Sequence, residues 1–288
     1  MIAGGQRWIV YGSRSDVVRI RWTGDWHTWH RYCALKRLRA DLREIAEDDA
    51  TFWFHGGDYA EFISPYDRRF DPRMLKPDMR VADLGQLGHR QVEFVRDLMR
   101  PIAGKCLGLM RGNHEEKYMH RQESQQLHGW LCEELAVPNM GYSTVFDLIF
   151  ARDAGHKGPP VLRSAPLGAG HSSWRVRVFA HHGAGNAQTP GGKLNKLIRA
   201  MDYFPSADLV LMAHVHDEMT KRLARLDGNA KCTHIVDHEQ VGAICGSYLR
   251  TYGEGPASYG EMNLYRPVCI GMTEIQFRPD KKRIQVLA

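Results

Sequence analysis

The sequence predicts an α/β fold, and three observations carry this prediction. Short apolar runs such as Thr51–His55 and Asp208–Ala213 have the length and composition of buried strands. Longer stretches between several of these runs repeat apolar residues with the period of a helix. Polar residues, many of them histidine or aspartate, follow the apolar runs directly. In open α/β sheets, functional sites lie at the carboxyl ends of the strands, so these polar residues are candidate site residues.

The bulk composition is that of an ordinary globular protein. The chain has 288 residues, of which 43% are hydrophobic and 25% charged. No internal repeat or low-complexity linker divides it, so one domain over residues 1–288 is the simplest expectation. The formal net charge of +6 favours anionic partners such as phosphate esters or nucleic acid.

The cysteines and the apolar segments indicate the compartment. Six cysteines are scattered without a C-x-x-C pair, so neither a disulfide framework nor a zinc finger is expected. The first residues lack the apolar core of a signal peptide, and no stretch approaches the roughly eighteen apolar residues of a membrane span. We therefore expect a cytoplasmic protein without a membrane partner, whereas the sequence does not predict an oligomeric state.

The first expected strands are residues 8–11 and 17–22, and the second continues into Gly24-Asp25-Trp26-His27. Asp25 and His27 are two positions apart, so extended backbone would place both side chains on one face. A carboxylate and an imidazole together suit a divalent metal. The alternative is that Asp25 caps the following helix while His27 lies on the surface.

The next elements are a helix over residues 32–47, with apolar residues at 3-4-3 spacing, and a strand over residues 51–55. The strand ends in Gly56-Gly57-Asp58. Two glycines leave room for a ligand beside the carboxylate, although a turn aspartate is the simpler explanation of Asp58 in isolation. Residues 59–80 contain prolines and basic residues, and we expect an irregular loop near the mouth of the site.

A helix over residues 83–100 leads to a strand over residues 106–110, and residues 117–135 form the next helix. Between them lies Arg111-Gly112-Asn113-His114-Glu115. Asn113 offers a neutral oxygen ligand, and His114 titrates near neutral pH. Arg111 is a candidate phosphate contact or a simple surface charge. Glu115, like Asp83, is a candidate to orient a ligand histidine, but an early-helix charge is the alternative for Glu115.

The second half of the chain repeats the pattern of strands that end in polar residues. A strand over residues 141–150 is followed by an irregular loop over 152–170 and by a strand over 174–180. His181-His182-Gly183 follows, and adjacent histidines point to opposite sides, so at most one faces a given metal. Glycine-rich residues 191–196 are a candidate anion-binding loop without the Walker spacing.

The strand over residues 208–213 ends in His214-Val215-His216, where two histidines share one face at a spacing typical of metal ligands. Beyond residue 219 the chain is expected to be rich in β-strands. Five strand ends thus carry candidate ligands: Asp25-x-His27, Gly57-Asp58, Gly112-Asn113-His114, His181-His182-Gly183 and His214-x-His216.

This joint pattern resembles the calcineurin-like metallophosphoesterase superfamily, and phage- or prophage-type members in particular. The resemblance covers about Trp22 to His216 and implies a four-layer α/β/β/α sandwich of two mixed β-sheets. Two departures are Ala213, where the family usually has glycine, and Trp26 inside the first motif. Neither removes a ligand atom.

The resemblance also implies a role for each motif residue. It assigns one metal ion to Asp25, His27 and His216, and the other to Asn113, His214 and one of His181 or His182. His181 is preferred as the first residue after the strand, although His182 before Gly183 fits other members. Asp58 would bridge both ions, His114 would be a catalytic histidine beside the substrate, and Arg111 and Asn113 would contact the substrate.

The implied activity is hydrolysis of a phosphate ester, including a nucleotide or nucleic acid, with two divalent ions. Manganese is the expected metal, and iron, zinc or nickel also suit these ligands. The ions would clamp the phosphate and activate a bridging hydroxide for in-line attack. The charge and the loops at 59–80 and 152–170 favour diesters over monoesters.

Three alternatives remain from the sequence. The first is a DNA or RNA nuclease of the same superfamily, and the second is a non-catalytic nucleic-acid-binding scaffold with a relic site. The third is a metallo-β-lactamase-like hydrolase. Its H-x-H-x-D-H motif is not matched, because Asp217 and Glu218 follow His216.

Overall fold

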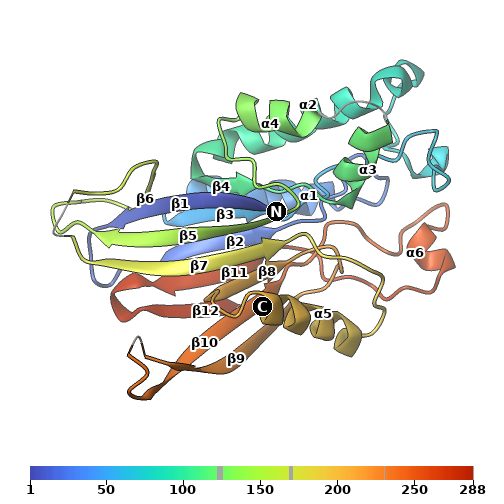
Figure 1. Ribbon diagram of the computed structural model, residues 1–288. Coiled ribbons are helices and arrows are strands. Elements are labelled where there is room, and N and C mark those ends of the chain that lie inside the picture. Colours follow the sequence, from blue (N-terminus) through green and yellow to red (C-terminus); the bar gives the residue numbers. More distant parts are fainter. Residues whose placement is uncertain (122–125, 169–170, 230, 288) are drawn as a thin grey trace.

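Two β-sheets pack face to face, with helices on the outer side of each (Figure 1). The computed structural model describes residues 1–121, 126–168, 171–229 and 231–287. One sheet has seven strands and the other has five. Both contain parallel and antiparallel pairs, so the predicted four-layer α/β/β/α sandwich of mixed sheets is confirmed.

The seven-stranded sheet has the order β6-β1-β5-β7-β8-β10-β9. Its strands, in that order, are Val161–Arg163, Ile2–Tyr11, Ser143–Arg152, Ser173–His181, Leu209–Met212, Ile235–Ile244 and Met219–Gly228. The five-stranded sheet has the order β12-β11-β2-β3-β4, with strands Arg283–Leu287, Thr273–Arg278, Val18–Thr23, Thr51–His55 and Cys106–Leu109. Strands β2, β3 and β4 are parallel, as are β7, β8 and β10, which aligns their carboxyl ends.

The helices form two outer layers. In the described part of the chain, the α-helices are α1 Leu35–Glu47, α2 Leu87–Met99, α3 Asn113–Arg121, α4 Leu127–Glu134, α5 Pro190–Tyr203 and α6 Tyr259–Met262. Short 3₁₀ helices cover Pro72–Met74, Val81–Gln86, Arg100–Lys105 and Pro279–Lys281. Helices α1, α2 and α4 cover the five-stranded sheet, whereas α5 packs on β8, β9 and β10 of the other sheet.

The main core lies between the sheets, where aromatic rings from both sides meet. Trp22 and Phe54 of the smaller sheet are fully buried, and Phe54 contacts Phe146 of the larger sheet with 5.2 Å between ring centroids. The indole N–H of Trp22 donates to the carbonyl of Met212 at 3.2 Å. The two sheets are therefore joined close to the ends of β2 and β8, which lead into candidate site loops.

Several local predictions differ from the structure. Residues 191–196, predicted as an anion-binding loop, are the first turns of α5. The Thr189 hydroxyl caps this helix by accepting from the Gly192 N–H, and Pro190 occupies its first position. The predicted loop at 152–170 contains the edge strand β6, and the predicted helix over 117–135 is α3 and α4, with residues 122–125 outside the described part. Within the described residues, no helix combines the length and apolarity needed to cross a bilayer.

The buried ring of His128 in α4 predicts that the stability of this fold depends on pH. The ring is buried, accepts from the Tyr59 hydroxyl at 3.4 Å and donates to Asn139 Oδ1 at 3.1 Å. Burial, reinforced by Arg111, lowers the pKa of His128 to about 3. A lowered histidine pKa means that stability is complete above about pH 6.5 and is lost as the pH falls.

We expect His128 to remove about 2 kcal/mol from the free energy of unfolding between pH 7.5 and 5.0. Urea unfolding in EDTA measures this free energy in the wild type and in His128→Gln at both pH values. The wild type should lose about 2 kcal/mol more than the variant, because glutamine does not titrate. Equal losses in the two proteins would show that His128 is not the titrating group.

Candidate metal centre

The predicted ligand residues follow strands of both sheets and lie at one end of the sandwich. Asp25 and His27 follow β2, Asp58 follows β3, and Asn113 begins α3 just after β4. From the larger sheet, His182 follows β7, while His214 and His216 follow β8. Because the carboxyl ends of these parallel strands are aligned, chain segments almost 190 residues apart meet here (Figure 1).

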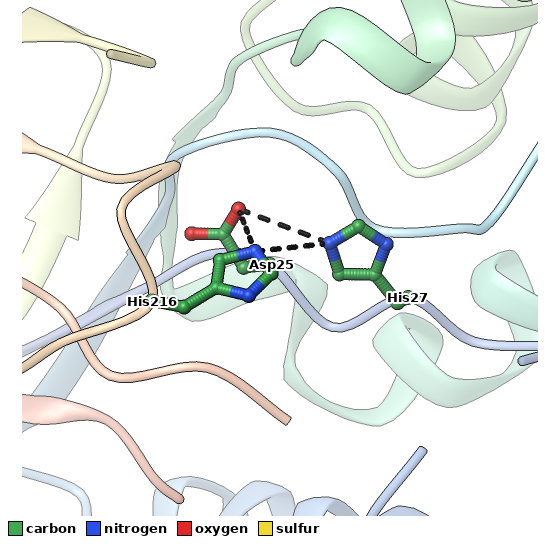
Figure 2. Close-up of side chains that lie close together, drawn as sticks. All are labelled: Asp25, His27 and His216. Carbon is green, nitrogen blue, oxygen red and sulfur yellow. Dashed lines mark hydrogen bonds and ion pairs between the residues drawn. The ribbon is translucent and has the colours of Figure 1, made fainter. Parts of the chain in front are cut away.

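Asp25, His27 and His216 form the first group of possible ligands (Figure 2). Asp25 Oδ1 lies 3.3 Å from His216 Nε2 and 4.0 Å from His27 Nε2. The two Nε2 atoms are 3.3 Å apart. One carboxylate oxygen and two imidazole nitrogens thus converge on a common point, as the resemblance implied.

Asp58, His182 and His214 form the second group, and Asn113 lies beside it. His182 Nε2 is 3.3 Å from Asp58 Oδ2 and 3.2 Å from Asn113 Oδ1. Asp58 Oδ2 also lies 3.9 Å from His27 Nε2 of the first group. Asp58 therefore stands between the two groups, where a carboxylate shared by two metal ions would lie.

Two unpartnered atoms test whether these residues fit metal ions. Asp25 Oδ2 accepts from the His214 backbone N–H at 2.7 Å, whereas the buried Oδ1 has no hydrogen-bond partner among the described residues. His214 Nε2 hydrogen-bonds the Gly185 carbonyl at 3.0 Å, so Nε2 carries the proton, and the buried Nδ1 has no partner either. Burial lowers the pKa of His214 to about 4, which keeps the ring neutral at pH 7.

An uncompensated buried acceptor is costly, and a divalent cation satisfies it. His214 Nδ1 and Asp25 Oδ1, which accept no hydrogen bond among the described residues, therefore offer lone pairs to two ions, one in each group. The donors are nitrogen and oxygen without thiolate, a set that suits manganese, iron, zinc and nickel alike. The residues fit a pair of divalent ions, and the donor set does not distinguish among these metals.

His182, not His181, belongs to the second group, so the preference for His181 was wrong. Strand β7 extends one residue further than predicted: His181 is still paired with Ser143 and Met212. The side chains of neighbouring residues point to opposite sides, and the first residue beyond the strand is His182. His181 Nδ1 instead accepts from the Gly183 N–H at 2.8 Å.

The backbone at the ligand residues is left-handed, not extended as the shared-face argument assumed. Of eleven described non-glycine residues with positive φ, five are predicted ligands: Asp25, His27, Asp58, His214 and His216. Such conformations cost on the order of 1–3 kcal/mol each and occur where surrounding contacts enforce them, often at functional sites. Gly112 permits the closest contact, because a Cβ there would lie 2.0 Å from Asp58 Oδ1.

Glu61 is a site residue that the sequence argument missed. Its carboxylate is buried and lies 2.9 Å from His27 Nδ1. Burial alone would raise the pKa of Glu61, but His114, His30 and the hydrogen bond to His27 lower it to about 2. A carboxylate on the outer nitrogen of a ligand histidine fixes the ring and makes it a better donor. Glu61 lies in the irregular 59–80 segment, so no local pattern marks it.

Replacing Glu61 with alanine is expected to raise the Kd for Mn²⁺ by about 10- to 100-fold. The His27 ring loses the carboxylate that orients it and that makes Nε2 a better electron donor. Isothermal titration calorimetry measures the Kd, with Glu93→Ala on the exposed face of α2 as the control. Glu61→Gln should restore part of the affinity, since the amide oxygen still accepts from Nδ1. An unchanged Kd in Glu61→Ala would contradict this role.

The two carboxylates predicted to orient ligand histidines, Asp83 and Glu115, accept hydrogen bonds from backbone N–H groups instead. Asp83 accepts from the Arg80 N–H at 3.0 Å and caps a 3₁₀ helix. Glu115 is fully buried and accepts from the backbone N–H groups of Asp58 at 2.8 Å and Gly112 at 2.7 Å. Burial, with the nearby Asp58 charge, raises the pKa of Glu115 to about 8. Glu115 thus connects the loop after β3 to the start of α3.

His114 and Arg111 have different surroundings. The His114 backbone N–H donates to Asp58 Oδ1 at 2.8 Å, its Nδ1 hydrogen-bonds the Glu61 carbonyl, and its ring lies 4.7 Å from that of His27. Arg111 forms an ion pair with Glu116 at 3.2 Å and is not among the residues that line the cavity over the centre. His114 therefore lies at the site, whereas Arg111 is ion-paired and does not line the cavity, and its role as a substrate contact stays a prediction.

A cavity of about 620 Å³ opens over the two groups. Its floor includes Asp58, Asn113 and His114, and its walls come from residues 63–75, 184–193 and 249–268. Part of the 59–80 loop thus borders the site, as expected, whereas the 249–268 wall was not anticipated.

Comparison with known families gives one match. The model of the family described as calcineurin-like phosphoesterase matches residues 18–218, which includes every predicted ligand. No curated protein matches the chain.

The solved structures that are similar to this chain include the following three. A conserved protein of Streptococcus pneumoniae TIGR4, described as a predicted phosphoesterase, has 13% identity over 91% of this chain and 84% of its own, with a TM-score of 0.32. Vps29 of Entamoeba histolytica, solved with zinc, has 8% identity over 94% of this chain and 97% of its own, with a TM-score of 0.35. GAP50, described as the anchor in the inner membrane complex of Plasmodium, has 11% identity over 90% and 81%, with a TM-score of 0.41.

Proposed function

Since the chain belongs to the calcineurin-like phosphoesterase family, we propose that it is a metal-dependent phosphoesterase that hydrolyses diesters in preference to monoesters. The observation that carries the proposal is the pair of ligand groups, with Asp58 in the second group and 3.9 Å from His27 of the first. Asp25, His27 and His216 would hold one ion, and Asn113, His182 and His214 the other. Two divalent ions supply Lewis acidity and lower the pKa of water to near neutral.

The protein's own residues supply positioning and proton transfer. The Glu61 carbonyl holds His114 through Nδ1, which leaves Nε2 as the nitrogen available to a substrate oxygen. His114 gives a proton from Nε2 to the leaving oxygen in its imidazolium form, and burial lowers the pKa of His114, so this form loses its proton readily. Asp58 Oδ1 accepts from the backbone N–H of His114, and this hydrogen bond fixes the position of His114 relative to the Asp58 carboxylate.

The preference for diesters is supported by the size of the cavity. A volume of about 620 Å³ is within the usual range for small-molecule sites and accommodates substituents on both sides of a phosphate. Five cationic side chains line it: Arg69, Lys117, Lys193, Arg250 and Arg266. This charge attracts anionic substrates of either kind, so the size of the cavity carries the preference.

Initial rates on p-nitrophenyl phosphate and bis(p-nitrophenyl) phosphate test the proposal. The protein is loaded with Mn²⁺, Fe²⁺, Zn²⁺ or Ni²⁺, and EDTA serves as the metal-free control. We expect kcat/KM to be at least about tenfold higher for the diester, an effect of about 1.4 kcal/mol. Equal rates on both esters would remove the diester preference, and turnover in EDTA would contradict metal dependence.

A further inference from the structure

Residues 251–266 form a closed loop at the wall of the cavity, here called the 251–266 loop. The Thr251 hydroxyl donates to the Arg266 carbonyl at 2.9 Å, and the Tyr252 hydroxyl donates to the Tyr265 carbonyl at 2.8 Å. The two ends of the loop are thereby joined, as in the compact Ω-loops that often carry function. In Figure 1 this orange-red loop, which carries α6, extends on the same side of the sandwich as α3 and α5.

This loop exposes an unusual share of the large apolar side chains. Four of the twelve exposed large hydrophobic residues among those described lie on it: Tyr252, Tyr259, Met262 and Leu264. Tyr259 also lines the cavity although 59% of its surface is exposed, and its ring lies 5.9 Å from that of Tyr265, edge to face. Concentrated exposed apolar surface beside a site indicates contact with a ligand.

Most of the cationic side chains of the cavity that form no ion pair within the described part of the chain lie on or directly beside the 251–266 loop. Arg69 forms an ion pair with Asp67, and Lys193 forms one with Asp217. The other three cations of the cavity form no ion pair among the described residues: Lys117, Arg250 and Arg266. Arg250 directly precedes the loop and Arg266 is its last residue. The hydrogen bond from Thr251 to the Arg266 carbonyl joins these two ends of the loop.

The loop therefore offers free guanidinium groups next to exposed aromatic rings. Its own carboxylates, Glu254 and Glu261, do not line the cavity. Guanidinium groups bind phosphate, and exposed rings stack on bases whose faces are accessible. In a duplex the base faces are covered by their neighbours, whereas a single strand presents both its phosphates and its base faces.

We propose that the 251–266 loop holds the nucleotides next to the scissile phosphate of a single-stranded nucleic acid. Arg250 and Arg266 bind a neighbouring phosphate, and Tyr259 stacks on a base. This inference rests on the proposed function and names its substrate class. A simple aryl diester lacks both the second phosphate and the stacked base, so it depends less on the loop than a single strand does.

Binding in EDTA tests the loop separately from turnover, because the metal-dependent reaction is stopped. Fluorescence anisotropy of fluorescein-labelled dT10 gives the Kd for the wild type, for Tyr259→Leu/Arg266→Gln, and for the control Tyr203→Leu/Arg199→Gln. The control removes the same two side-chain types from the exposed face of α5. We expect the Kd to rise about tenfold or more in the loop variant, and less than twofold in the control. An equal Kd in the wild type and the loop variant, or equally strong competition by duplex DNA, would overturn the proposal.

Hydrolysis with Mn²⁺ then distinguishes the two proposals. The ratio of kcat/KM on dT10 to kcat/KM on bis(p-nitrophenyl) phosphate should fall about tenfold in the loop variant and stay constant in the control. A constant ratio in both variants overturns the role of the loop and leaves the phosphoesterase proposal intact. Absence of any turnover in the wild type refutes the proposed function, and the binding measurement still decides whether the loop holds single strands.

Discussion

Replacing Asp58 with asparagine is expected to lower kcat/KM for bis(p-nitrophenyl) phosphate by about 10³-fold, or about 4 kcal/mol of transition-state stabilisation. Asp58 is the carboxylate that lies between both ligand groups, 3.3 Å from His182 Nε2 and 3.9 Å from His27 Nε2. Asparagine removes the charge but keeps an oxygen for the His114 N–H, and it tolerates the left-handed backbone at this position. The loss therefore reports on metal binding and not on a collapsed loop.

Metal analysis accompanies the kinetic measurement. We expect two metal ions per wild-type chain and at most one in Asp58→Asn. Asp97→Ala, at an exposed aspartate of α2 that pairs with Arg96, serves as the control and should match the wild type in both measurements. Full activity in Asp58→Asn would exclude a shared ligand at this position.

His114→Gln is expected to lower kcat by about 10²- to 10³-fold while the metal content stays at the wild-type level. His114 lies beside the ligands and is held by the Glu61 carbonyl, and the proposal gives it a proton-transfer role without coordination. Glutamine at this position can still donate a hydrogen bond but cannot donate a proton to the leaving oxygen. The largest loss should therefore occur on substrates with poor leaving groups.

The comparison of leaving groups separates this role from a structural one. On thymidine 5′-p-nitrophenyl phosphate, whose nitrophenolate leaves without protonation, the variant should be impaired less than on a dinucleotide, whose leaving group is an alcohol. His89→Gln, at an exposed histidine of α2, is the control. An equal loss on both substrates, or a loss of metal, would assign His114 to positioning or to coordination instead.

The strand ends were predictable because they combine two strong local signals. Residues 51–55, 106–110 and 208–213 are apolar on both faces, and in the structure they are β3, β4 and β8, covered on both sides. The polar residues after them have no place inside the sheets and therefore gather at the edge. In the structure β2 is parallel to β3 and β8 is parallel to β10, and the packing of the two sheets brings Asp25, Asp58 and His214 together at one end.

Other features depend on signals too weak or too distant for the sequence argument. The choice between His181 and His182 rests on a single residue of strand length, which apolar periodicity does not resolve. Helix α5 has Thr189 as its N-cap and Pro190 as its first residue, which is a typical helix start. The two glycines that follow favoured a loop in the sequence analysis instead. Glu61 reaches His27 across 34 residues through an irregular loop, so only the tertiary structure reveals the contact.

The central claim is that two metal ions share Asp58. An anomalous difference map from crystals grown with Mn²⁺ tests it most directly. We predict two peaks: one bound by Asp25, His27 and His216, the other by Asn113, His182 and His214, and both contacted by Asp58. A single peak away from Asp58, or no peak at these residues at saturating Mn²⁺, would contradict it.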